Sequence, residues 1–283
     1  MTQIKTTVRR RAGTPPPKTV TPPKTTPSIV GRPPGTVKRL IGLLFGPPKT
    51  GKTTGGASGT TVESGEQTLM ISFDPDGDLA ETLIGRTDIV VITPTIDEMD
   101  GIIKALYTTD AGRFKVVLLD SITFLFQAAG GKEIYKTYKD NKDVRRAYGK
   151  AGAITAQIIS DLVNIPAPTS VIFTAHLKHA NEDEAKKLDA GLGENEVQVA
   201  VSPMVWAVLG PAVSFIGRTY RQTTWEDEIV GGKKKRNKKT AFRVSLNDGE
   251  RSPAGSRLPM AADYEVTPTW LSELADTLIK GGE

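Results

Sequence analysis

The stretch LLFGPPKTGKTT, residues 43–54, decides the fold of this chain. An apolar run ends at Gly46, and with Gly51, Lys52 and Thr53 it matches the pattern G-x-x-x-x-G-K-[ST]. In such a loop, main-chain N–H groups point at phosphate oxygens, the lysine reaches the β- and γ-phosphates, and the hydroxyl binds Mg²⁺. We therefore predict a phosphate-binding loop (P-loop) for ATP. Its residues are Gly46, Pro47, Pro48, Lys49, Thr50, Gly51, Lys52, Thr53 and Thr54.

Short apolar runs alternate with helical patterns on the carboxyl side of the P-loop. Several runs are apolar at successive positions, which is typical of strands buried on both faces of a parallel sheet. The segments between them place apolar residues at helical spacing. The sequence therefore predicts an α/β fold with a mostly parallel central sheet. The predicted strands are 37–46, 67–74, 88–94, 114–121 and 169–176, and the predicted crossover helices are 96–107 and 144–165.

Other parts of the chain differ in composition. Residues 1–36 consist mainly of Thr, Pro, Lys and Arg, so we predict a disordered basic tail before a domain at 37–283. Residues 177–200 are long and polar, which predicts a mobile loop. Two late strand patterns flank residues 231–240, which predicts a β-hairpin with a basic tip. Residues 268–280 predict a C-terminal helix.

The composition excludes several classes of protein. The 283 residues include no cysteine and two histidines, which excludes a disulfide framework and a thiolate metal site. No apolar stretch reaches the roughly 20 residues that span a bilayer. We therefore expect no membrane partner and a cytoplasmic location.

The net charge of +5 is concentrated in two segments. Residues 1–40 contain nine Lys or Arg and no acid, and the run KKKRNKK at 233–239 adds six positive charges. Such clusters indicate a polyanion such as nucleic acid, although a merely solvated charge run is the alternative for either one. Tyr220 and Trp225, near the second cluster, either stack on bases or pack in the protein. The candidate DNA-binding residues are Lys233, Lys234, Lys235, Arg236, Lys238 and Lys239.

One acid and one histidine end predicted strands. Four apolar residues lead into Asp120, which we expect to hold Mg²⁺ together with Thr53 from a strand neighbouring the P-loop. His176 ends another strand, where it either hydrogen-bonds the γ-phosphate or has a structural role.

Three more acids follow the strand at 67–74. Asp74, Asp76 and Asp78 are candidates for the carboxylate that orients the attacking water. A turn built from Asp, Pro and Gly is the competing explanation, because these residues favour tight turns. Spacing alone leaves the choice among the three acids open.

Together these segments resemble the RecA-like ATPases, which include recombinases and ring helicases. MISFDPDG (70–77) is similar to the family's strand whose second acid is the catalytic carboxylate, usually Glu, and this implies Asp76. VVLLDSITFL (116–125) is similar to the recombinase metal-binding strand. AHLKHA (175–180) is more similar to phage helicases and the small phage Sak-type annealing ATPases. That likeness implies His176 as the γ-phosphate sensor and Lys178 as a group that reaches a neighbouring subunit's nucleotide.

The resemblance also implies partners. Members of this family assemble into rings or filaments, hold ATP and Mg²⁺ between subunits, and bind single-stranded DNA with loops that face the axis. Arg218 and Arg221, on a late predicted strand, are candidates for a finger that reaches the adjacent subunit. The alternatives to this role are that they contact DNA phosphates or that they lie on the surface without such a role. The segment 177–200 occupies the place of a DNA loop, but it carries acids as well as bases, so the segment 233–239 is the better candidate on charge.

The leading hypothesis is a phage-type, ATP-dependent protein that binds single-stranded DNA in recombination or annealing, located in the bacterial host cytoplasm. A ring helicase of the same fold, a small-molecule P-loop kinase and an ATP-binding assembly switch without turnover are the alternatives. The proline-rich tail at 1–36 could assist DNA capture or tether a single-strand-binding protein or another recombination factor.

Overall fold

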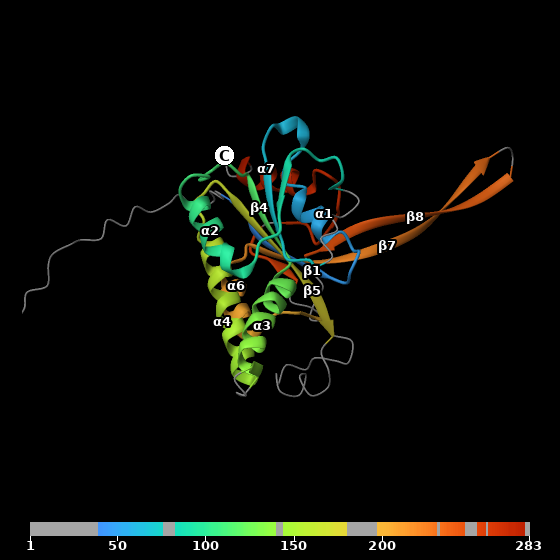
Figure 1. The fold of residues 1–283 in the computed structure, drawn as a ribbon. Helices are drawn as coiled ribbons and strands as arrows, with labels where there is room; N and C mark the ends of the chain where they lie inside the picture. The colour runs from blue at the N-terminus through green and yellow to red at the C-terminus, as the bar shows by residue number, and fades with distance from the viewer. Residues whose placement is uncertain are drawn as a thin grey trace, which may run out of the picture. The chain divides into compact units, whose positions relative to one another are not determined.

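The structure is a computed structural model that describes residues 39–75, 83–139, 144–179, 197–230, 233–246, 254–258 and 260–280. Its centre is one sheet with the strand order β10-β8-β7-β1-β5-β4-β2-β3, and the six strands from β7 to β3 run parallel (Figure 1). β8 and β10 join antiparallel at one edge. The prediction of a mixed α/β fold with a mostly parallel central sheet is confirmed. The predicted tail at 1–36 lies outside the described residues.

The central strands occupy the predicted apolar runs: four have shorter bounds, and β5 extends three residues beyond the predicted end at His176. They are β1 Ile41–Gly46, β2 Thr68–Ser72, β3 Ile89–Ile92, β4 Val116–Asp120 and β5 Ser170–His179. The later strands are β6 Val197–Val199, β7 Phe215–Val230, β8 Lys233–Ser245, β9 Gly255–Ser256 and β10 Asp263–Glu265.

Neighbouring residues of each central strand face opposite sides of the sheet, and both sides are buried. Leu43 and Phe173 belong to one hydrophobic cluster, while Leu44 and Ile172 belong to another. This explains the unbroken apolar runs in the sequence. The first cluster is covered by α2 Met99–Tyr107, α3 Ile122–Lys139, α4 Val144–Val163 and α6 Pro203–Ala212. The second is covered by α1 Lys52–Ala57 and α7 Trp270–Lys280.

The short helix α1 forms although TTGGASG is a poor helical sequence, because its glycines allow close packing on the sheet. A Cβ on Gly56 would lie 2.6 Å from a side-chain carbon of Leu118. At the end of α1, the buried Ser58 hydroxyl donates to the Gly55 carbonyl and accepts from the N–H of Leu271. This hydroxyl therefore connects the helix after the P-loop to α7.

Two helices were not predicted. The first turn of α3 is apolar except for Thr123, and two glycines follow, so the segment lacks the single apolar stripe of a surface helix. α6 is apolar over most of its length and contains Pro211 in its last turn. α3 and α4 lie side by side as a helical hairpin, and α4 also contacts α6 (Figure 1). Burial among other helices replaces the missing amphipathic pattern.

β7 and β8 form the predicted antiparallel hairpin, but the position of its basic residues needs correction. β7 and β8 pair continuously from Arg218↔Ser245 to Val230↔Lys233, so the basic residues of 233–239 lie along a strand and not in the turn. Beyond residue 221, the described part of β7 pairs only with β8, and the two strands extend together away from the other strands (Figure 1). We call residues 222–230 with 233–241 the β7–β8 ribbon.

The predicted mobile loop at 177–200 is partly strand. Leu177, Lys178 and His179 continue β5 and pair antiparallel with the three residues of β6. Residues 180–196 lie outside the described part of the chain. The segment 177–200 therefore begins and ends in a two-stranded base, which starts directly after His176. In this base, hydrogen bonds between the two strands pair the main-chain N–H and C=O groups.

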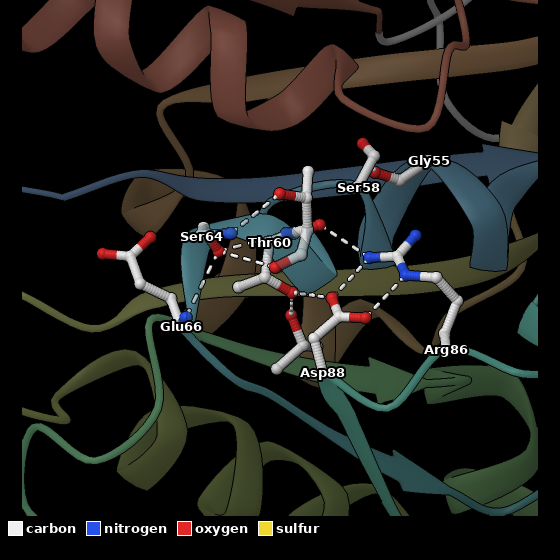
Figure 2. Close-up of polar contacts among 9 residues, drawn as sticks. Gly55, Ser58, Thr60, Ser64, Glu66, Arg86 and Asp88 are labelled. Carbon is white, nitrogen blue, oxygen red and sulfur yellow. Dashed lines mark hydrogen bonds and ion pairs between the residues drawn. The ribbon is translucent and has the colours of Figure 1, made fainter.

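A buried polar network fastens the opposite end of the sheet from the P-loop. Arg86 donates to both carboxylate oxygens of Asp88 and to the main-chain carbonyl of Thr60 (Figure 2). The Thr60 hydroxyl donates to Asp88 at 2.8 Å and hydrogen-bonds the hydroxyl of Thr68 at 2.8 Å. Asp88, only 5% exposed, precedes β3, and Thr68 begins β2. The network joins the segment after α1 to both strand starts.

Candidate functional site

The P-loop follows β1 at the centre of the sheet and leads into α1. Gly51 has φ +86°, a left-handed conformation that residues with a Cβ rarely adopt. A Cβ there would also approach the Phe242 side chain to 3.0 Å. Lys49 has a positive φ of 59° as well. The two left-handed residues give this loop its tight course.

The underside of the P-loop is tied to β7. The buried Thr50 hydroxyl donates to the carbonyl of Pro47 at 2.8 Å and shares a hydrogen bond of 2.7 Å with the Thr219 hydroxyl. Thr219 also donates to the carbonyl of Phe45 at 3.3 Å. The side chain of Thr50 therefore shapes the loop, so the group it can offer to a ligand is its main-chain N–H.

The ammonium group of Lys52 lies inside the P-loop. Its Nζ donates to the carbonyls of Gly46 at 3.1 Å and Pro47 at 2.7 Å, and the residue is 8% exposed. Burial lowers the pKa of Lys52 to about 8, against the opposing effect of the Asp120 carboxylate. A buried ammonium group held by carbonyl dipoles gains from a nearby anion, which is the property expected of a phosphate-binding lysine.

Thr53 and Asp120 meet at the carboxyl edge of the sheet. The Thr53 hydroxyl donates to Asp120 Oδ2 at 2.6 Å, and the Thr174 hydroxyl donates to Asp120 Oδ1. Hydroxyl and carboxylate oxygens are hard ligands of the kind that Mg²⁺ prefers, so these residues fit the ion. The peptide bond between Asp120 and Ser121 is cis.

One expectation about Asp120 was wrong. β4 does not neighbour β1, because β5 lies between them. Asp120 reaches Thr53 across the end of β5, where Thr174 supports its second oxygen.

His176 stands beside the P-loop at the end of the parallel part of β5, in register with Gly46. Its main-chain N–H donates to the Thr123 hydroxyl at 3.0 Å, and its ring meets Phe124 edge-on at 4.9 Å between centroids. Burial first, and then the charge of Lys52, lower the pKa of His176, while Asp120 and Asp74 oppose the shift. The imidazole is thus neutral at pH 7 and lies within electrostatic reach of the P-loop lysine.

The candidate carboxylates after β2 are only partly described. Asp74 follows β2 and its N–H donates to the Ser72 hydroxyl at 3.3 Å. β2 is paired with β4, which brings this strand end next to Asp120. Asp76 and Asp78 lie outside the described residues, so the choice of Asp76 stays a prediction.

The three candidates for a finger to another subunit have different positions. Arg218 is in register with Phe45 of β1, and Lys178 is exposed on β5 opposite Gln198. Arg221 donates from Nη2 to the Lys49 carbonyl at 3.0 Å, and its guanidinium lies 5.8 Å from the Phe242 ring centroid. Arg221 therefore touches the P-loop of its own chain. The role of all three toward a second subunit stays a prediction.

The two aromatic residues near the basic segment differ in exposure. Tyr220 donates its hydroxyl to Asp263 at 3.1 Å, which fixes it against β10. Trp225 is 55% exposed on the β7–β8 ribbon, and the Arg236 guanidinium lies 5.2 Å from its ring centroid. Arg236, Lys238 and Lys239 are exposed on the same ribbon, while the side chains of Lys233, Lys234 and Lys235 are not described.

Three residues of the site were missed. Thr174 holds Asp120, while Thr219 and Phe242 pack behind the P-loop. Thr174 had a sequence signal: it is a polar residue in an apolar run, two positions before His176. Thr219 and Phe242 had none, because they come from β7 and β8, far along the chain.

Among the described residues, no helix is long and apolar enough to cross a membrane. A family model described as "AAA domain" (AAA_24) matches residues 38–241, more than half of the chain. This range contains the P-loop, Asp120, His176 and the β7–β8 ribbon.

Two further comparisons are weaker. The sorbose-specific EIIC component of a PTS system from Lacticaseibacillus casei is 34% identical over 97 residues, and the match covers 34% of each chain. This chain therefore spans about a third of the length of that relative. A crystal structure of the RadB recombinase has a TM-score of 0.41 and 15% identity over 81% of this chain and 88% of that one. A likeness at this level carries no argument about function.

Proposed function

This chain belongs to the AAA_24 family of AAA domains, and on that premise we propose that it is an ATP-dependent protein that binds single-stranded DNA in recombination or annealing, of the phage Sak type. The observation that carries the nucleotide half of the proposal is the 2.6 Å hydrogen bond from Thr53 to Asp120. These residues are 67 positions apart, and both are expected ligands of Mg²⁺ in a P-loop protein.

Each residue of the site has a defined part in this proposal. Main-chain N–H groups of residues 49–53 and the ammonium group of Lys52 bind the phosphates of ATP. Thr53 and Asp120 hold Mg²⁺, Asp120 through water, and the ion neutralises charge on the phosphates when it is bound. Asp76 orients the attacking water. His176, neutral at pH 7, offers an N–H to the γ-phosphate and connects that contact to the β5–β6 base of the segment 177–200.

The DNA half of the proposal rests on the basic strand of the β7–β8 ribbon. Lys233 to Lys239 add six positive charges on an element that extends from the sheet next to the P-loop. Phosphate contacts by lysine and arginine supply most of the sequence-independent affinity for nucleic acid. Assembly into a ring or filament would place several such ribbons around one strand.

ATP turnover with and without single-stranded DNA, measured beside the size of the assembly, tests this function. We expect turnover that DNA stimulates and that Lys52→Ala abolishes, because Lys52 supplies the ammonium group that binds the phosphates. Undiminished turnover in Lys52→Ala would remove the P-loop assignment. Turnover that requires a small-molecule acceptor would indicate the kinase, and binding without turnover would indicate an assembly switch.

A ring helicase of the same fold is the second candidate. It shares every nucleotide-binding residue, so turnover alone does not separate it from an annealing protein. Unwinding of a forked duplex under conditions of ATP turnover is the measurement that distinguishes them. We expect annealing of complementary strands and no unwinding.

A further inference from the structure

An exposed tryptophan lies among cationic side chains on the β7–β8 ribbon. Trp225 is 55% exposed, the Arg236 guanidinium lies 5.2 Å from its ring centroid, and Lys238 stands directly opposite it in register. Directly opposed residues of antiparallel strands have Cβ atoms about 4.5–5.5 Å apart and share one face. The ring is therefore offered to a ligand between two cations.

The exposed cations of the ribbon continue beyond this pair. Lys239, next to Lys238 on β8, is exposed as well and stands opposite Thr224 in register. Arg236, Lys238 and Lys239 together supply positive potential for a polyanion around Trp225.

The face that carries Trp225 leads to the P-loop. Side chains alternate between the two faces of a strand, so Trp225 shares its face with Arg221, about 13 Å away at four residues. Arg221 stands opposite Phe242, donates to the Lys49 carbonyl, and with Phe242 packs at the loop. A ligand bound on Trp225 therefore lies on the same face of the strand pair as Arg221, which contacts the P-loop.

We propose that Trp225 stacks on an unpaired base of single-stranded nucleic acid while Arg236 and Lys238 contact the adjacent phosphates. The inference deepens the proposed function and rests on it. Stacking on an aromatic ring needs an exposed base face, which a duplex does not offer along its length, and it tolerates any sequence. The site is therefore selective for single strands without reading their sequence.

Affinity for a labelled oligonucleotide, measured by fluorescence anisotropy, tests the stacking contact. Trp225→Ala should weaken binding about tenfold to a hundredfold, the usual loss for one stacked base, whereas Trp225→Phe should stay within about threefold of wild type. Tyr135→Ala is the matched control, because Tyr135 is 71% exposed on α3, away from the ribbon. It should bind as wild type does.

Salt dependence separates stacking from charge. Lys238→Ala should reduce the slope of log affinity against log salt by about 0.7, and Trp225→Ala should leave that slope unchanged. Tryptophan emission should fall when the oligonucleotide binds to wild type, and this quenching should be lost in Trp225→Phe. Thermal melting of each variant checks that the fold is retained.

Several results would overturn the proposal. Equal affinity of Trp225→Ala and wild type would show that the ring contacts no base. A change in assembly size of Trp225→Ala in the absence of DNA would assign the ribbon face to a neighbouring subunit. Equal affinity for a duplex of the same length would remove the stacking mode while leaving a basic DNA contact. If wild type binds no single strand at all, the proposed function fails together with this inference.

Discussion

Lys52 illustrates how one residue combines structural and functional demands. Its ammonium group is buried and donates to two carbonyls of its own loop. These hydrogen bonds offset part of the free-energy cost of burying the charge, but burial still lowers the pKa to about 8. The lowered pKa follows from burial without a full counter-charge, since Asp120 opposes the shift only in part. An anion in the P-loop would supply that charge.

We expect the affinity for ATP to fall as the pH rises above about 8. Below this pH the free protein already carries the proton on Lys52, whereas above it binding must add one, which costs up to tenfold in affinity per pH unit. Calorimetric titration with ATP between pH 7 and 9.5 measures the effect. Lys52→Arg is the control, because its guanidinium stays charged throughout. An equal decline in Lys52→Arg would assign the effect to another group.

The choice of catalytic carboxylate is also a matter of single residues. Asp76→Asn should leave ATP binding nearly intact and lower kcat by about a hundredfold to ten-thousandfold, as expected when a group that positions or deprotonates water is lost. The measurement is steady-state turnover beside the Kd for ATP. If Asp74→Asn shows this loss and Asp76→Asn does not, the catalytic carboxylate is the one directly after β2.

At the scale of elements, the P-loop is held from behind by strands that come late in the chain. Thr219 of β7 supports Thr50, Phe242 of β8 packs at Gly51, and Arg221 binds the Lys49 carbonyl. The loop and the base of the β7–β8 ribbon are therefore one structural unit. These three contacts connect the base of the ribbon directly to the nucleotide site.

Arg221→Ala should raise the KM for ATP about threefold to tenfold with little change in kcat, because it loosens the loop without removing a reacting group. Arg221→Lys should recover part of the loss. Arg257→Ala provides a matched control: Arg257 is also an exposed arginine that donates to a main-chain carbonyl, that of Pro211, away from the P-loop. An unchanged KM in Arg221→Ala would mean that the loop keeps its shape without this contact.

At the scale of the whole molecule, the sheet is fastened at both ends of its strands. The carboxyl edge holds the candidate site, and the opposite edge holds the network of Arg86, Asp88 and Thr60 (Figure 2). Hydrogen bonding to Arg86 is the main cause that lowers the pKa of Asp88. The folded state therefore favours the ionised form of Asp88.

Asp88→Ala should lower the free energy of unfolding by about 1–3 kcal/mol at pH 7, since the partly buried Arg86 keeps its hydrogen bond to the Thr60 carbonyl but loses its counter-charge. Urea denaturation measures the loss. The folded pKa of Asp88 is depressed, so its contribution is present above the unfolded pKa near 4 and is lost as the pH falls through the lower folded value. The difference between variant and wild type should therefore narrow in acid.

Asp110→Ala is the control for this comparison. Asp110 pairs with Arg113 three residues later on the surface, and such exposed pairs contribute about 0–1 kcal/mol. A loss as large as that of Asp88→Ala would indicate that burial does not decide the effect.

The sequence by itself determined the α/β class, the central strands and the P-loop. Each depends on local patterns: apolar runs long enough to be buried on both faces, helical spacing between them, and a glycine-rich spacing that only a tight anion-binding turn requires. The same locality explains why Asp120 could be placed at the end of a strand and His176 at the end of the parallel part of β5. It also explains the errors: α3 and α6 lack an amphipathic stripe because other helices cover them.

Only the tertiary structure decided which strands are neighbours and which side chains meet. It inserted β5 between β1 and β4, so that Thr174 supports Asp120, and it brought Thr219, Arg221 and Phe242 behind the P-loop. It also placed the basic run along a strand beside Trp225. Strand order and register depend on contacts between residues far apart in the chain, and no local spacing records those contacts.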